Sequence, residues 1–247
     1  KKLYNLGQYQ DSFDAATSIL ACDSELIDWL QIQANSAMHL KKYDEARIAL
    51  EKILAINPLD FASLKDLGNL YRIQGDVEQA ESYYMKSIDI NNTYVPAITN
   101  LGTLLFYENR DTDKGINLMQ QAINLDKNFL LGWINLANAY YNVHDFNNSF
   151  EACKIILKLN LHITEIQVLL CKNLFKQNKL DITKQYCLRF SQINPSCINF
   201  YLFLGSISYE ENNYIQSEKF FRQALDIDPN VINASYNLAK VLFKQLK

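Results

Sequence analysis

The chain has 247 residues, of which 49% are hydrophobic, enough to bury an extensive core and too many for a disordered chain. Its net charge of -3 shows no basic excess of the kind that phosphate backbones select, so we expect no nucleic-acid partner. Seven glycines and four prolines are few for a β-rich fold, which needs frequent turn residues, and the composition therefore favours helices.

The five cysteines are odd in number and lack a C-x-x-C spacing, so neither a disulfide framework nor a zinc site is expected. We therefore expect an intracellular, cytoplasmic location and no cofactor or metal. No run of eighteen apolar residues occurs, and no membrane span is expected. The first residues, KKLYNLGQYQ, contain neither an initiator Met nor a signal-peptide core, which suggests a fragment of a longer protein.

Two series of small residues recur every 34 residues along the chain. The first series is Ala34, Gly68, Gly102, Ala137, Cys171, Gly205 and Ala239. The second series is Ser12, Ala46, Ala80, Gly115, Ser149, Thr183 and Ser217. Each series has one step of 35, and both longer steps place an additional residue in the stretch YENRDTDKG.

Each period is expected to form a helix–turn–helix hairpin. Trp133, Leu136, Ala137 and Tyr140 have the i, i+3, i+4, i+7 spacing of one helical face, and polar breaks such as LKKYDEA separate the two helices. Because one hairpin cannot bury both faces, the hairpins are expected to stack into an open solenoid. In chain order the expected repeats are 1–26 (truncated), 27–60, 61–94, 95–129, 130–163, 164–197, 198–231 and 232–247 (partial).

The residues of these periods resemble the tetratricopeptide repeat family, whose pattern begins W-x-x-L-G and ends in Pro. WINLANAY with Ser149, LKDLGNLY with Ala80, and YLFLGSIS with Ala224 and Pro229 carry the resemblance, which covers the whole chain. It implies an all-α, right-handed superhelical solenoid that is part of a larger repeat-containing protein.

The repeat at 95–129 departs from the family pattern, because Thr112 replaces an aromatic residue and Gly115 replaces Ala. We expect it to be the loosest repeat. Its additional residue is interpreted as a tolerated insertion in a surface turn, in preference to a hinge or contact loop.

The sequence offers little for catalysis. His39, His144 and His162 lie in different repeats, and no Gly-rich phosphate loop or G-x-S-x-G motif occurs. Cys153 and Cys187 lie at equivalent positions one repeat apart, which is typical of core packing. We therefore expect that this segment is not an enzyme.

A stripe of polar residues on the first helices is the candidate binding surface. On α-helical geometry, Asn135, Asn138 and Asn142 lie opposite Trp133 and Leu136. A row of carboxamides can bind the N–H and C=O groups of an extended peptide. The resemblance to the tetratricopeptide family transfers these positions to the other repeats, and the predicted peptide-binding residues are then Asn35, Lys65, Asn69, Arg72, Asn100, Thr103, Asn135, Asn138, Tyr141, Asn142 and Lys172. Thr99 is expected beside them, and Val168, Leu169, Leu202 and Phe203 are expected to give the later repeats an apolar preference.

Two family subtypes can be compared with this stripe. Lys65, Asn69 and Asn100 are similar to three of five residues with which chaperone-tail adaptors grip a carboxylate, but Leu131 and Asn135 replace the two cations. Losing both cations disfavours an acidic chaperone tail. Asn100, Asn135 and Asn237 resemble the asparagine ladder of O-linked N-acetylglucosamine transferases, which is interrupted here at Ile32, Asp66, Leu169 and Phe203.

We therefore expect a protein-interaction scaffold or adaptor that binds an extended peptide of a partner protein along a concave groove, as a subunit of a multiprotein complex. The alternative is the non-catalytic, substrate-recognising arm of a larger glycosyltransferase.

Overall fold

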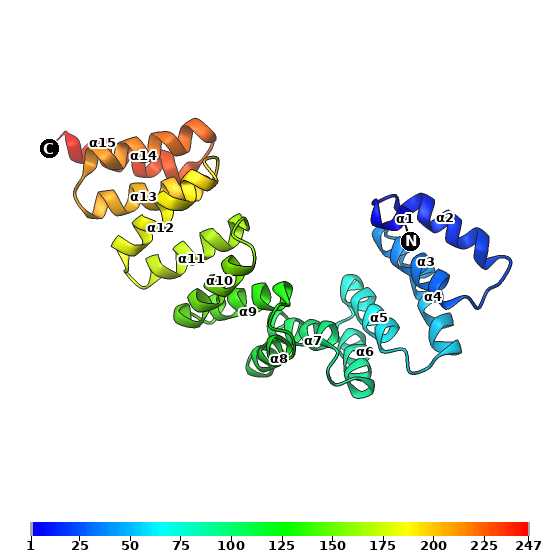
Figure 1. The fold of residues 1–247 in the computed structure, drawn as a ribbon. Helices are drawn as coiled ribbons and strands as arrows, with labels where there is room; N and C mark the ends of the chain where they lie inside the picture. The colour runs from blue at the N-terminus through cyan, green and yellow to red at the C-terminus, as the bar shows by residue number, and fades with distance from the viewer. Residues whose placement is uncertain (1, 247) are drawn as a thin grey trace. The chain divides into compact units, whose positions relative to one another are not determined.

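Fifteen α-helices and no strand make up the part of the chain that the computed structural model describes, residues 2–246 (Figure 1). The chain divides into two compact units, with the boundary between Lys127 and Asn128. Within each unit, every helix packs on the next one in the chain. The all-α solenoid architecture expected from the sequence is confirmed.

Unit 1 contains eight helices in its described part. They are α1 (Lys2–Asn5), α2 (Tyr9–Leu20), α3 (Ile27–His39), α4 (Tyr43–Ile56), α5 (Phe61–Gln74), α6 (Val77–Ile90), α7 (Val95–Tyr107) and α8 (Thr112–Leu125).

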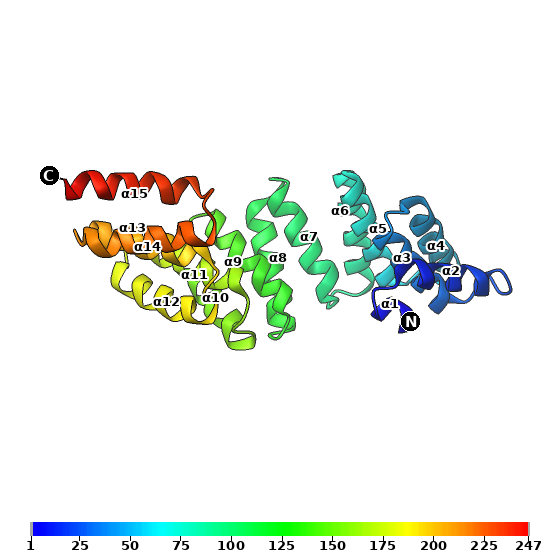
Figure 2. The ribbon, with the colours of Figure 1, turned by 90° about the horizontal axis from the view of Figure 1, so that it is seen from above.

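Unit 2 contains seven helices in its described part, and α15 packs alongside α13 and α14 (Figure 2). The helices are α9 (Leu130–Asn142), α10 (Phe146–Leu159), α11 (Thr164–Lys176), α12 (Leu180–Ile193), α13 (Ile198–Glu210), α14 (Tyr214–Ile227) and α15 (Ile232–Gln245). In both units the odd-numbered helix is the first helix of a hairpin and the even-numbered helix is the second.

Glycines of the first series lie where the two helices of a hairpin meet, whereas Ala239 of α15 is exposed. Gly68 and Gly205 each face a large aromatic residue of the second helix, sixteen positions later. A Cβ added at Gly68 would lie 2.5 Å from the Tyr84 ring, and one at Gly205 would lie 2.6 Å from the Phe221 ring. Because protein interiors are close-packed, a large partner requires a glycine opposite it.

Hydroxyl groups of the second series add a hydrogen bond to this packing. Ser149 Oγ donates to the carbonyl oxygen of Ala137 at 2.7 Å, and Ser217 Oγ donates to that of Gly205 at 2.7 Å. Both serines are fully buried, so the bond also satisfies a hydroxyl that would otherwise be costly to bury. Ser149 and Ser217 are thus small enough for the helix contact and polar enough to reach the facing helix, whereas the Thr183 hydroxyl donates to Lys179 O at the start of its own helix.

The repeat formed by α7 and α8 differs from the sequence-based expectation. Gly102 and Gly115 face each other, and a Cβ on either would lie 2.8 Å from the carbonyl oxygen of the other. Two glycines at one crossing let the backbones approach closely. The expectation of a loose repeat is wrong, because the glycine at position 115, where the family pattern has alanine, allows the backbones of α7 and α8 to approach closely.

Each turn inside a hairpin contains one residue with a left-handed backbone conformation. These residues are Gly7, Lys41, Gly75, Asn109, His144, Asn178 and Asn212. This conformation ends the first helix and satisfies its last carbonyl groups, as in the hydrogen bond from Asp76 N to Tyr71 O at 2.9 Å. The turns therefore form a third series with the period of the two small-residue series.

This third series locates the additional residue of the 95–129 repeat. Asp76 directly follows Gly75 and caps α6, whereas Asp111, which caps α8, stands two positions after Asn109. Arg110 is therefore the inserted residue. Its guanidinium is 3.4 Å from the Glu81 carboxylate in an exposed turn.

Candidate binding surface on the first helices

In unit 1, polar side chains connect three successive first helices, α3, α5 and α7. Gln31 Nε2 donates to Asp66 Oδ2 at 3.1 Å, and Asn69 Nδ2 donates to Asp66 Oδ1 at 3.5 Å. Asn100 Nδ2 donates to Asn69 Oδ1 at 2.7 Å. These bonds form a polar ladder, Gln31–Asp66–Asn69–Asn100, whose side chains are held in position before any partner binds.

Asn69 is the centre of this ladder. Its Oδ1 accepts a second hydrogen bond, from the Tyr84 hydroxyl at 2.8 Å. The Tyr84 ring is fully buried under Gly68, and burial raises the pKa of Tyr84 to about 12. Because its carbonyl oxygen is occupied twice, Asn69 orients its neighbours and has little capacity left to accept from a ligand.

The two predicted cations of unit 1 differ in their surroundings. Lys65 Nζ is hydrogen-bonded to the Asp66 carboxylate, and each of these side chains is 17% exposed. Arg72 is exposed near the end of α5. The charge of Lys65 is compensated within the protein, which adds to the sequence argument against binding of a carboxylate tail.

The remaining predicted residues of unit 1 lie on the ladder or beside it. Asn35 is half-buried and accepts a hydrogen bond from Gln31 at 3.2 Å. Thr103 Oγ1 donates to Thr99 O at 2.8 Å. Thr99 itself is fully buried, so the expectation that it belongs to the surface stripe is wrong, because its side chain lies in the interior of the repeat stack.

In unit 2, the predicted residues are spread along α9 and α11. Asn138 Nδ2 donates to Ile134 O within its own helix at 2.9 Å, and Asn135 is half-buried. The Tyr141 ring lies 5.5 Å from that of Phe146, which makes it a half-buried packing residue. Two further predicted residues are exposed, Asn142 and Lys172.

Helix α11 buries an amide and two apolar residues of its first turns. Asn173 is fully buried, and its Nδ2 donates to Ser149 Oγ at 2.8 Å and to Leu169 O at 3.0 Å. Val168 and Leu169 are each only 7% exposed. The expected apolar preference at these two residues is therefore wrong, because both pack in the core of unit 2.

Two pockets open on the first helices, one in each unit. The larger has a volume of about 530 Å³ and lies between α1 and α3. The smaller, of about 120 Å³, is lined by residues of α13, α14 and α15, among them Ser206, Glu210 and Lys240. Among residues that line the larger pocket, the sequence analysis predicted Asn35 but missed Tyr4, Asp28 and Trp29, whose proximity depends on how α1 folds against α3.

The described residues include no group of three or more His, Cys, Asp and Glu side chains placed to hold a metal ion. Burial raises the pKa of the Cys153 thiol to about 12, which suits a packing residue rather than a nucleophile. Across residues 2–246, every helix is too short or too polar to cross a membrane.

A model of the tetratricopeptide repeat family matches three stretches of the chain, 30–58, 66–94 and 198–231. Among curated proteins, the photosystem I assembly protein Ycf3 of Acaryochloris marina is 33% identical over 89 residues, which are 36% of this chain. The matched part spans about half, 51%, of that relative's length.

Solved structures with the same fold cover most of the chain. The C-terminal part of a TPR repeat-containing protein from Cytophaga hutchinsonii matches with a TM-score of 0.76 and 16% identity, over 96% of each chain. YrrB, described as a TPR protein with an unusual peptide-binding site, matches with a TM-score of 0.67 and 15% identity, over 76% of this chain and 96% of its own. At these identities the similarity shows the fold alone.

Proposed function

Because the chain contains tetratricopeptide repeats, a fold used for protein–protein interaction, we propose that it is a scaffold that holds an extended segment of a partner protein on the first helices of unit 1. The polar ladder of Gln31, Asp66, Asn69 and Asn100 is the observation that carries this proposal.

The ladder supports peptide binding because it is rigid and only partly satisfied. Asn100 uses one N–H group toward Asn69, and Asn35 accepts a single bond, from Gln31. Each amide retains donor and acceptor capacity that can meet the alternating N–H and C=O groups of an extended chain. Since one such bond contributes about 1 kcal/mol net, binding requires several of them together.

A role in assembling a multiprotein complex is a more specific form of this proposal. Its support is the similarity to Ycf3, which is named as an assembly protein. A scaffold of this kind would hold a partner subunit without transforming it, in line with the expectation that the segment is not an enzyme. The glycosyltransferase-arm alternative has no further support.

The proposal is tested with a phage-displayed library of peptides of about twelve residues, selected on the intact chain, since that length spans several first helices. The double variant Asn35→Ala/Asn100→Ala removes one amide of the ladder and the Asn35 amide beside it, and leaves Asn69 bonded to Tyr84. We expect the selected peptides to bind this variant at least about tenfold more weakly, from two lost hydrogen bonds.

The matched control is Glu78→Ala/Lys86→Ala, because both residues are exposed on the second helix α6. This control should retain the affinity of the wild-type chain. Unchanged affinity of the ladder variant, with unchanged circular dichroism, would place peptide binding elsewhere and refute the proposal.

A further inference from the structure

The pocket between α1 and α3 has features that the ladder alone does not explain. Its volume of about 530 Å³ lies in the range of ligand-binding pockets. The polar and aromatic residues that line it are Tyr4, Asn5, Asp28, Trp29, Gln31 and Asn35. Among the described residues, two aromatic rings, three amides and one carboxylate therefore line this cavity at one end of the polar ladder.

The carboxylate of Asp28 supplies an uncompensated negative charge. Asp28 lies in the first turn of α3, is exposed, and has no hydrogen-bonded or ionic partner within the described part of the chain. The adjacent carboxylate, Asp66, accepts from Gln31 and is paired with Lys65. Lys65 is therefore already paired, and Asp28 is the one charged side chain among the described residues that line the pocket.

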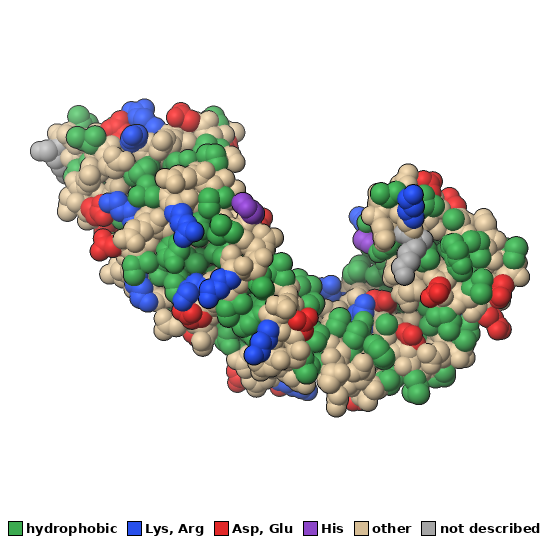
Figure 3. Space-filling model, viewed as in Figure 1, with side chains coloured by type: hydrophobic (Ala, Val, Ile, Leu, Met, Phe, Trp, Pro, Cys, Tyr) green, Lys and Arg blue, Asp and Glu red, His purple; other side chains and the backbone are tan. Residues whose placement is uncertain are grey.

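The charge of the whole unit has the same sign. Residues 1–127 contain 12 Lys and Arg against 18 Asp and Glu, a net charge of -6. Residues 128–247 contain 12 Lys and Arg against 9 Asp and Glu, a net charge of +3. Figure 3 shows basic side chains gathered over α10–α12. A field of one sign over a unit favours partners of the opposite sign.

We infer that this pocket binds an arginine side chain of the partner segment. A guanidinium group is planar, stacks on aromatic faces, and carries five N–H donors that suit a carboxylate and amide oxygens together. Trp29 and Tyr4 provide the aromatic faces, and Asp28 provides the charged acceptor. The Oδ1 atom of Asn35 accepts only the bond from Gln31 at 3.2 Å and has a second lone pair for a guanidinium N–H.

This inference rests on the proposed peptide-binding function and specifies the chemistry of its partner. The pocket is continuous with the ladder, because Gln31 both lines it and bonds to Asp66. A segment that extends along the ladder would therefore place one arginine side chain in the pocket while its backbone contacts Asn100. We therefore expect the partner segment that binds unit 1 to be basic.

The test uses the full chain and three synthetic pentapeptides, Ac-Ala-Ala-Xaa-Ala-Ala-NH₂, in which Xaa is Arg, citrulline or Leu. Citrulline has the shape of Arg without its charge. Affinity is measured by calorimetric titration, and the indole N–H resonance of Trp29 reports occupancy of the pocket, since the chain has only two Trp residues. We expect saturable binding of the Arg peptide with a shift of that resonance, and at least tenfold weaker binding of the citrulline and Leu peptides.

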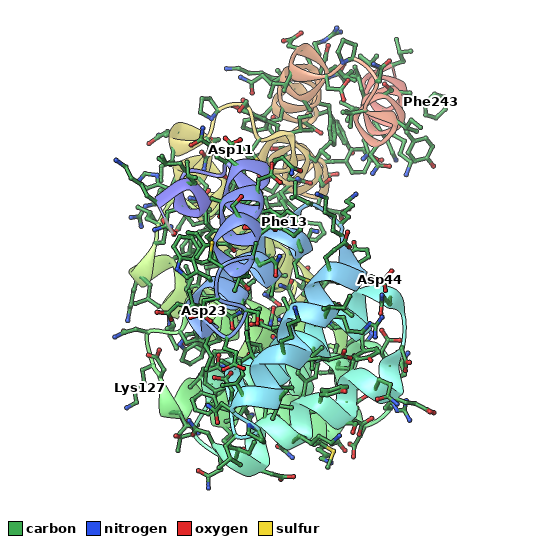
Figure 4. All side chains as sticks on the ribbon, turned by 90° about the vertical axis from the view of Figure 1, so that its right-hand side faces the viewer. Asp11, Phe13, Asp23, Asp44, Lys127 and Phe243 are labelled. Atoms are coloured by element: carbon green, nitrogen blue, oxygen red, sulfur yellow. The ribbon has the colours of Figure 1, made fainter. Side chains whose placement is uncertain are left out.

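The variant Asp28→Asn should weaken the Arg peptide at least tenfold and leave the citrulline peptide unchanged. The matched control is Asp11→Asn, which removes the same charge from α2 outside the pocket (Figure 4). It should leave binding of the Arg peptide within twofold of wild type.

The inference is overturned if citrulline or Leu binds as tightly as Arg, if no peptide shifts the Trp29 resonance, or if Asp28→Asn has no effect. If one of these results is found while library peptides still bind through Asn35 and Asn100, only the arginine pocket is refuted. If library peptides also fail to depend on Asn35 and Asn100, the proposed function is refuted as well.

Discussion

The complementary packing of Gly205 against Phe221 predicts a specific response to mutation. The Cβ of Gly205→Ala would lie 2.6 Å from Cε1 and 2.8 Å from Cδ1 of a ring that is 1% exposed. A methyl group at these distances overlaps the ring, so the large, enclosed Phe221 side chain would have to move. Elsewhere in the chain, the equivalent pair is Ala34 with Leu50, where a smaller partner leaves room for the methyl group.

The expected magnitude combines two opposing effects. Overpacking a core costs about 1 to 3 kcal/mol, whereas Gly→Ala inside a helix gains about 1 kcal/mol. Gly205→Ala should therefore destabilise the α13–α14 hairpin by about 0 to 2 kcal/mol, although it improves helix propensity. Phe221→Leu alone should cost about 1 to 2 kcal/mol, a part of the ~3–5 kcal/mol that truncation of Phe to Ala costs.

The double variant Gly205→Ala/Phe221→Leu reproduces the Ala34–Leu50 pair and removes the overlap. It should be more stable than the sum of the single variants by at least about 1 kcal/mol, because the two residues are in contact. Ala239→Gly is the matched control, since Ala239 is the equivalent residue of α15 and is exposed. Ala239→Gly measures the effect of helix propensity on stability without a change in core packing.

Amide hydrogen exchange of α13 and α14 in the native protein is the appropriate assay. Repeat proteins open locally, so a single global unfolding transition would not isolate one hairpin. Additivity of the two single variants within about 0.5 kcal/mol would refute the volume-exchange argument.

Three further predictions concern a helix cap, a buried phenol and the thiols. Asp145→Ala removes the side-chain acceptor of Asn148 N at 3.1 Å and should lower the opening free energy of α10, measured by amide hydrogen exchange, by about 1 kcal/mol. Asp226→Ala, which removes an exposed aspartate that caps no helix, should change the opening free energy little. Burial raises the pKa of Tyr84 from 10.0 to about 12 in the folded chain, so its contribution of about 2 to 3 kcal/mol is present below pH 10 and lost as pH rises toward 12. Because burial also raises the pKa of Tyr4, Tyr83, Tyr94 and Tyr107, Tyr84→Phe should reduce the loss of stability over this range in urea unfolding without abolishing it. Exposed Cys22 should react first with a disulfide reagent, and Cys22→Ser should remove that fast phase, whereas rapid reaction of buried Cys153 would contradict the described packing.

The terminal helix α15 shows how far repeat periodicity can be extended. Ile232, Tyr236 and Phe243 are 81%, 61% and 59% exposed, and Figure 4 shows Phe243 projecting from the helix. The sequence period places an aromatic residue at 243 in register with Tyr209, which is half-buried. Residues at equivalent positions of the repeat, such as Tyr209 and Phe243, therefore differ in exposed fraction, because α15 has no second helix of its repeat among the described residues.

The sequence by itself determined the hairpin architecture, because a 34-residue period of small and apolar residues has one efficient way to bury its faces. It also assigns Asn35, Asn69 and Asn100 to one polar stripe, through helical rotation within a repeat and the family resemblance between repeats, and their role in peptide binding stays a prediction. Only the tertiary structure decided which of these amides are free to bind. Asn69 is occupied by Tyr84 and Asn100, because side chains fifteen and 31 residues away reach it. The pocket beside Asp28 likewise depends on the position of α1 near α3, which the spacing of residues within either helix does not specify.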